Sequence, residues 1–126
     1  MAASLAEYEK ALVALADALT LHDGYSDPAA KKLARDGCIQ RFEFCVELAW
    51  KVAGKAMGSN STAANLVIRE LARNEYIDDP EKWFEFVKAR NESSHTYDEQ
   101  VAAKVFMFCR SFLPAGQALL LKLKGK

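Results

Sequence analysis

The stretch CIQRFEFCVELAWKVAGKAM, residues 38–57, carries a wide apolar face. One row of this face repeats at heptad-like spacing and consists of Cys38, Phe42, Cys45, Ala49, Val52 and Ala56. A second row lies beside it and consists of Ile39, Val46, Trp50, Ala53 and Met57. A face of this width is typical of a helix that lies at the centre of a bundle or is shared with a partner chain.

The central helix extends in both directions from this stretch. Asp27 and Pro28 form an N-cap followed by proline at the first helical position, and Gly58 follows Met57 as a C-terminal stop. We therefore expect one helix over about 28–57, with Asp36-Gly37 as the point at which it can bend or break.

The remaining chain predicts shorter amphipathic helices joined by short loops. Ser4 and Glu7 form a capping box, and Asp79-Pro80 repeats the cap and proline pattern. We expect helices over about 5–20, 62–74, 80–93 and 97–112, with Pro114 ending or kinking the last one and a further amphipathic turn or two over 115–123. Residues 21–26 are expected to form a loop that leaves His22 in solvent.

These elements predict an all-α fold, an up-and-down four-helix bundle with a possible extra short helix, formed by residues 1–126 as one domain. The aromatic residues of the helix over 80–93 are expected to serve the core or a dimer contact, rather than a platform on which bases stack.

Composition narrows the classes of function. The 126 residues include 17 basic and 17 acidic side chains, and this balance argues against broad nonspecific binding of nucleic acid while leaving room for a small phosphate site. The spacing of the histidines and cysteines fits no metal site, and no cofactor motif is present. With no signal peptide and no apolar run of about 18 residues, we expect no membrane association and a cytoplasmic protein, in which Cys38, Cys45 and Cys109 are reduced, buried thiols.

The segment RNESSHTY, residues 90–97, combines chemistry-bearing residues at a predicted break between two helices. On one continuous helix Arg90 and His95 would lie about 140° apart, so a break is needed for both to reach one target. Thr96 and Glu99 have the form of a capping box, which would place His95 and Tyr97 at a helix N-terminus that favours an anion such as phosphate. The alternative is a surface loop in which the histidine has no role.

Two interpretations remain open for the charged side chains of the central helix. Glu43, Glu47 and Lys51 are most simply a solvated face. Alternatively, a glutamate of this helix orients Arg90 or His95 across the bundle.

The pattern Arg90-x4-His95-x-Tyr97 resembles the motif of HEPN domains, and the segment RFEFCVELAWK, residues 41–51, resembles a helix of one branch, the nucleotidyltransferase substrate-binding proteins. The likeness extends over nearly the whole chain. It implies a HEPN-like helical bundle that forms a homodimer and pairs with a minimal nucleotidyltransferase (MNT) encoded nearby, often as a toxin–antitoxin system.

The same resemblance implies a metal-independent endoribonuclease in which Arg90 and His95 are catalytic. The nucleotidyltransferase would silence it by transferring AMP to Tyr97, and Asn91, Glu47 and Glu43 would support the site. RNA cleavage without a metal needs a base, an acid and a cation near the phosphate. One His95 could act as the base, and a second His95 from a symmetric partner as the acid. Two alternatives remain, a noncatalytic subunit that helps the nucleotidyltransferase hold its substrate, and a structural module whose motif is coincidental.

Overall fold

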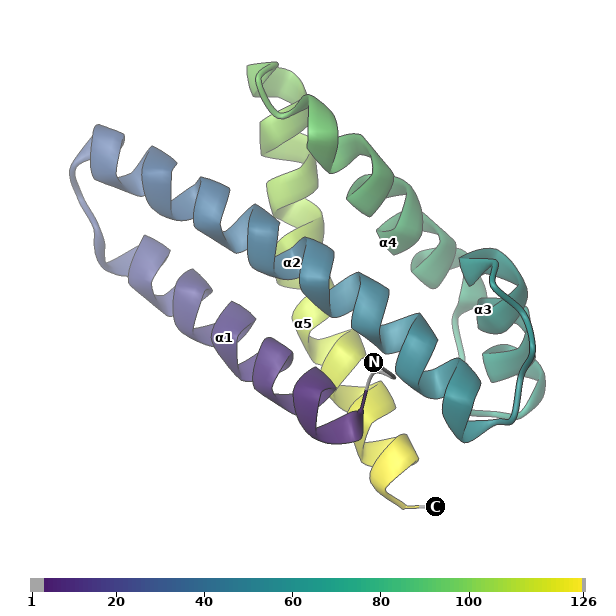
Figure 1. The fold of residues 1–126 in the computed structure, drawn as a ribbon. Coiled ribbons are helices and arrows are strands. Elements are labelled where there is room, and N and C mark those ends of the chain that lie inside the picture. The colour runs from purple at the N-terminus through teal and green to yellow at the C-terminus, as the bar shows by residue number, and fades with distance from the viewer. Residues whose placement is uncertain (1–3, 126) are drawn as a thin grey trace.

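The computed structural model describes residues 4–125 and contains five α-helices and a 3₁₀-helix, with no strand among these residues. The α-helices are α1 (Leu5–Gly24), α2 (Pro28–Ala56), α3 (Ala64–Arg73), α4 (Pro80–Glu92) and α5 (Glu99–Lys124), and the 3₁₀-helix η1 (Ser93–His95) follows α4. The predicted all-α bundle is confirmed, and α3 is its extra short helix (Figure 1).

Helix α2 is the centre of the bundle, because it contacts α1, α3, α4, α5 and η1. Its apolar rows are buried from Cys38 to Ala53, apart from the half-buried Trp50, and Figure 1 shows α1 and α2 running side by side. Asp27 accepts a hydrogen bond from the backbone N–H of Ala30 at 3.0 Å and begins the helix. The helix runs through Asp36-Gly37 without a break and ends at Ala56, two residues before Gly58, whose φ of +71° suits glycine.

The core is centred on Phe112 of α5. Its ring makes edge contacts with Phe42, Trp83 and Phe86 at centroid distances of 5.6, 5.5 and 5.2 Å. These rings come from α2 and α4, so one side chain of α5 joins three helices.

Of the two alternatives predicted at Pro114, an end of the helix over 97–112 is wrong, because α5 continues through Pro114 to Lys124. Pro114 lies on the exposed side of the helix, whereas Leu119, Leu120 and Leu123 beyond it are buried. Close packing continues through Gly116, whose carbonyl oxygen accepts a hydrogen bond from the Tyr8 hydroxyl at 2.8 Å. A Cβ at Gly116 would lie 2.9 Å from atoms of Leu12 and Phe112, so α5 packs tightly just beyond the proline. The burial of this part of the helix outweighs the backbone hydrogen bond that Pro114 cannot donate.

The prediction of a solvated loop around His22 is wrong. Helix α1 continues to Gly24, and His22 is buried with its ring 4.6 Å from that of Phe106. Asp23 receives hydrogen bonds from Arg110 of α5, which hold the pKa of its carboxyl well below the usual range. The dipeptide Asp23-Gly24 by itself favours a turn, and the contact with α5 therefore extends α1 through it.

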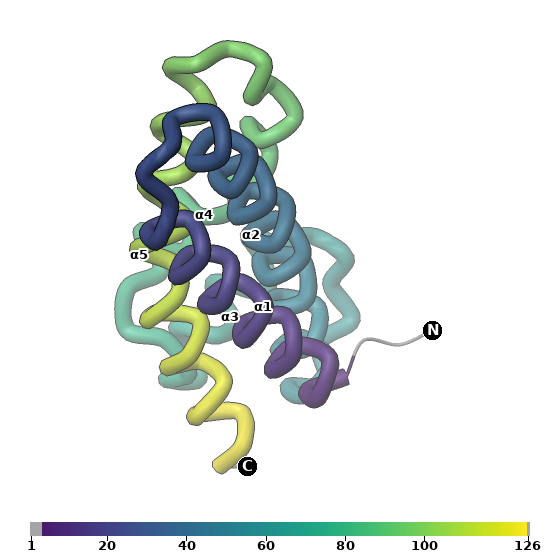
Figure 2. The backbone as a smooth tube through the Cα atoms, turned by 90° about the vertical axis from the view of Figure 1, so that its left-hand side faces the viewer, coloured from purple at the N-terminus to yellow at the C-terminus, as the bar shows by residue number. Residues whose placement is uncertain are grey.

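The turn between α4 and α5 lies at one end of the bundle, and the C-terminal end of α5 lies at the other (Figure 2). Within residues 4–125, no helix has the length and apolar character needed to cross a membrane. Cys38, Cys45 and Cys109 are buried and free, as expected, and burial raises the pKa of the Cys45 thiol to about 12.

Candidate active site at the end of α4

Helix α4 carries Arg90 to the rim of the bundle. Asp79 caps the helix by accepting the backbone N–H of Lys82 at 3.2 Å, and Pro80 takes the first helical position. Trp83, Phe86 and Ala89 are buried at intervals of three residues. This buried face fixes the rotation of α4 and leaves the next residue, Arg90, partly exposed with a side chain that is 31% accessible.

Two serines end α4 and turn the chain. The Ser93 hydroxyl donates to the carbonyl oxygen of Arg90 at 2.6 Å, and the Ser94 hydroxyl donates to that of Asn91 at 3.3 Å. Ser93 is also buried, so the turn is anchored to the bundle. These contacts compete with helical hydrogen bonds, which is why the chain continues as η1 through His95.

The predicted capping box of Thr96 and Glu99 is wrong. Asp98 caps α5 by accepting the backbone N–H groups of Gln100 at 2.9 Å and Val101 at 3.4 Å. Because aspartate caps a helix somewhat better than threonine, the nearer carboxylate occupies the N–H groups expected to bind an anion. His95 and Tyr97 consequently precede the first turn of α5.

Glu99 instead joins α5 to the start of α2. Both of its oxygens accept hydrogen bonds from Arg35 at 3.1 Å, and Lys32 lies 3.1 Å from one of them. Residues 35 and 99 are brought together only by the fold. The pair holds the segment that contains His95 against α2.

This pair predicts an acid-dependent loss of stability. The hydrogen bonds from Arg35, and then those from Lys32, lower the pKa of Glu99 to about 2. A carboxyl whose pKa is lower in the folded state contributes stability that is present above its unfolded pKa and is lost as the pH falls through its folded pKa. We therefore expect Glu99→Gln to flatten the decline of the thermal midpoint between about pH 5 and pH 2, as followed by circular dichroism.

The matched control is Glu85→Gln, because Glu85 is an exposed glutamate of α4 that forms no ion pair with a described residue. It should keep the wild-type acid dependence. An unaltered profile for Glu99→Gln would show that the pair does not stabilise the fold.

Arg90 is held by Glu47 of the central helix. Its Nε lies 2.9 Å from Oε1 of Glu47, while Oε2 of the same carboxylate lies 3.4 Å from Nζ of Lys51. The buried Nε–H is not aligned with that oxygen, so the contact is an ion pair rather than a hydrogen bond. The two Nη atoms form no hydrogen bond with residues 4–125, which leaves the planar end of the guanidinium available to a ligand.

The sequence left open whether a glutamate of the central helix orients Arg90 across the bundle. The ion pair between Glu47 and Arg90 is the contact that this interpretation requires. Glu43, one turn earlier on α2, forms no ion pair with a described residue. Asn91 is exposed.

His95 and Tyr97 lie together on the exposed surface of the turn. Their rings meet edge to face with centroids 6.0 Å apart, and Tyr97 is 85% exposed. No hydrogen bond or ring contact joins Arg90 to His95 within the part of the chain that the structure describes. The fold therefore pairs Arg90 with Glu47 and His95 with Tyr97, on the two sides of one short turn.

A groove beside Arg90 was not recognised from the sequence. Two cavities of about 340 and 550 Å³ share Glu47 and Trp50, and together they reach from Asn91 to the loop between α2 and α3. We call this feature the Trp50 groove, lined by Glu47, Trp50, Lys51, Gly54, Lys55, Ser59, Ser61, Thr62, Ala63, Ala64, Asn65, Val87 and Asn91. The helical pattern placed Trp50 in the second apolar row of the central helix, but the nearby lysines and polar loop residues were a signal of an open site.

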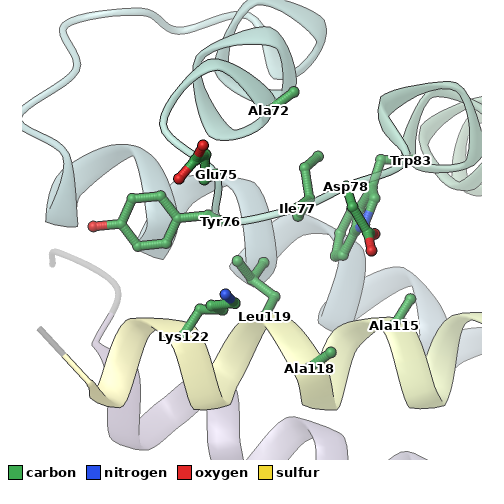
Figure 3. Close-up of a pocket in the computed structure, with 10 residues that line it drawn as sticks. All are labelled: Ala72, Glu75, Tyr76, Ile77, Asp78, Trp83, Ala115, Ala118, Leu119 and Lys122. Carbon is green, nitrogen blue, oxygen red and sulfur yellow. The ribbon is translucent and has the colours of Figure 1, made fainter.

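Another cavity, of about 400 Å³, lies between the α3–α4 connection and α5. Figure 3 shows Glu75, Asp78 and Lys122 at this cavity with Trp83 as one wall. It contains none of the motif residues. Among residues 4–125, no cluster of three or more histidine, cysteine, aspartate or glutamate side chains could hold a metal ion.

Comparison with known proteins agrees with this fold. The chain is 31% identical over 98 residues to a protein of Haemophilus influenzae named probable ribonuclease HepT, an alignment that covers 71% of this chain and 67% of that protein. It also resembles the structure of HI0074 from Haemophilus influenzae, described as the fold of a substrate binding domain of a nucleotidyltransferase. The TM-score is 0.82 at 26% identity, with 95% of this chain and 98% of the other covered.

The match to a protein family covers almost the whole chain, since residues 3–125 fit the family described as nucleotidyltransferase substrate binding protein like. The resemblance inferred from residues 41–51 and 90–97 is thereby confirmed at the level of the family. The chain belongs to the nucleotidyltransferase substrate binding protein-like family.

Proposed function

We propose that this chain is a metal-independent endoribonuclease that works in a pair with a minimal nucleotidyltransferase, as in toxin–antitoxin systems of the cytoplasm. The observation that carries the proposal is the end of α4, where an arginine with two unpartnered Nη atoms precedes a turn that exposes His95. The similarity to a protein named probable ribonuclease supports it.

The chemistry assigns a role to each side chain. His95 removes the proton of a 2′-hydroxyl, whose oxygen attacks the adjacent phosphorus, and the 5′-oxygen leaves with a proton from an acid. The Nη atoms of Arg90 stabilise the charge that develops on the phosphoryl oxygens. Histidine suits both proton transfers because imidazole titrates close to neutral pH.

A homodimer would supply the acid. Each chain offers one exposed histidine, because His22 is buried against Phe106. A second copy that brings its own His95 to the same phosphate would complete an acid and base pair. Glu47 is a positioning residue in this scheme, since it acts by holding Arg90.

Silencing would occur at Tyr97. Its phenol is 85% exposed, so an enzyme that supplies Mg²⁺ and a nucleotide can reach it. The phenol oxygen would attack the α-phosphorus of ATP and displace pyrophosphate, leaving AMP on the tyrosine. The added phosphate places negative charge beside His95, where it repels RNA.

We predict that co-expression with the partner nucleotidyltransferase raises the mass of the chain by whole AMP units. Intact-mass spectrometry should show the increase in the wild type and its complete loss in Tyr97→Phe. Tyr25→Phe is the matched control, because Tyr25 is also exposed but lies at the end of α1. An increase that persists in Tyr97→Phe would place the modification elsewhere.

A second candidate function is a noncatalytic subunit that binds the nucleotidyltransferase and helps it hold substrate. The ion pair with Glu47, which offsets part of the charge of Arg90, and the zero net charge of the chain favour it. Incubation of the purified chain with RNA in EDTA separates the two candidates. Cleavage supports the ribonuclease, while capture of the nucleotidyltransferase without cleavage supports the subunit.

A further inference from the structure

The Trp50 groove continues directly from the candidate active site. Asn91, the residue after Arg90, lines one end of the groove, and Glu47, which holds Arg90, lines both of its cavities, so that end is adjacent to the proposed position of the cleaved phosphate. The other end is the loop after α2, at Ser59 and Thr62. Each cavity falls in the size range of small-ligand sites, and the two together are longer than either alone.

Trp50 forms a flat wall at the middle of the groove. The residue is half-buried, and its indole Nε1 is buried without a hydrogen-bond partner among residues 4–125. The ring is therefore held in place by packing rather than by a hydrogen bond. The Lys51 ammonium lies over the ring, 5.6 Å from its centroid, so a cation stands next to the aromatic surface that a base would contact. This combination is typical of sites that stack a nucleobase and contact its phosphate.

The groove is locally positive although the whole chain has no net charge. Arg90 and Lys51 share the single carboxylate of Glu47, and Lys55 is exposed with no ion pair to a described residue. A second carboxylate, that of Glu70, approaches the loop end and accepts a hydrogen bond from the Ser59 hydroxyl at 3.0 Å. The Ser59 hydroxyl is thus bonded to Glu70. Lys55 is the lysine of the groove without an ion pair to a described residue, and Lys51 shares its carboxylate with Arg90.

The N-terminus of α3 opens into the same groove. Ala63, Ala64 and Asn65 line it, and the N-cap Ala63 has no side chain with which to bond the first turn. The backbone N–H groups of that turn are therefore available to an acceptor from a ligand, and phosphate is a common one.

We infer that the Trp50 groove binds the nucleotide next to the cleaved phosphate of a single-stranded RNA, with its base stacked on Trp50. The N-terminus of α3 and the Lys51 and Lys55 side chains bind its phosphates. Single-stranded RNA fits better than a protein partner because seven of the thirteen lining residues carry a hydroxyl, amide or ammonium group, and the N-terminus of α3 adds backbone N–H groups beside an aromatic ring. The inference rests on the proposed ribonuclease function and names the substrate path of that site.

Tryptophan fluorescence tests the inference directly, because the chain has only two tryptophans and Trp83 is 4% exposed in the core. The titrant is a single-stranded RNA with 2′-O-methyl groups, which the proposed reaction cannot cleave. We expect quenching by this oligonucleotide in the wild type and its disappearance in Trp50→Phe.

Affinity, measured by anisotropy of the labelled oligonucleotide, should fall about 5- to 150-fold in Trp50→Ala and far less in Trp50→Phe, which keeps a stacking face. Lys55→Ala should reduce the slope of the salt dependence by about one unit. Phe44→Ala is the matched control, because Phe44 is an exposed aromatic of α2 outside the groove, and it should bind as the wild type does.

The outcomes separate this inference from the proposed function. Unchanged affinity in Trp50→Ala overturns the groove assignment even if the chain cleaves RNA through His95. Loss of affinity in Trp50→Ala without any cleavage by the wild type keeps the groove and removes the ribonuclease.

Two other results overturn the assignment to RNA. Quenching by ATP or AMP that matches quenching by the oligonucleotide would make the groove a mononucleotide site. Loss of nucleotidyltransferase binding in Trp50→Ala, with oligonucleotide affinity intact, would make it a protein contact.

Discussion

Replacing His95 with alanine should lower the rate of RNA cleavage by about 10²- to 10⁴-fold, the usual contribution of a general acid or base. The change removes the proposed proton-transfer group and little else, because His95 is exposed and its one ring contact is with Tyr97. The measurement is the single-turnover rate on a labelled RNA in EDTA. Gln100→Ala is the control, since Gln100 is an exposed residue of the first turn of α5 whose side chain forms no hydrogen bond with a described residue, and it should keep nearly the full rate.

The same substitution tests the composite site. A mixed dimer with one wild-type chain and one His95→Ala chain keeps a single His95, so it retains no intact site if each phosphate needs both histidines. About half of the wild-type activity, or more, in the mixed dimer would show that each chain cleaves with its own histidine. A wild-type rate in the homogeneous His95→Ala protein would remove His95 from the mechanism altogether.

Replacing Phe112 with alanine should reduce the free energy of unfolding by about 3–5 kcal/mol, a large part of the 5–15 kcal/mol typical of a domain. The ring is fully buried and contacts aromatic side chains of α2 and α4, so its loss leaves a cavity where three helices meet. Urea unfolding followed by circular dichroism measures the change.

The control for Phe112 is Met107→Ala on the same helix, where the side chain is 72% exposed. That substitution should change the free energy of unfolding by no more than about 0.5 kcal/mol. A loss below about 1 kcal/mol in Phe112→Ala would mean that the bundle closes around the missing ring, and that the aromatic cluster is not the centre of its stability.

The candidate site was only partly predictable. The motif residues Arg90, His95 and Tyr97 could be selected because they lie close together in the chain at a helix break. Their surroundings could not, since the groove depends on how α2, α3 and α4 approach one another. Trp50 was assigned to the edge of the core for the same reason. A helical pattern gives the direction of a side chain but not whether a neighbouring helix covers it.

The sequence by itself determined the order and the approximate position of the main helices, because apolar spacing and N-caps such as Asp27 and Asp79 act within a few residues. The tertiary structure decided where local signals were overruled, as at Asp23-Gly24, where Arg110 extends α1, and at Pro114, where buried leucines carry α5 onward. It also decided the pairing of Arg90 with Glu47 and of Arg35 with Glu99. These pairs form between residues far apart in the chain, and only the packing of the helices brings such charges within reach of each other.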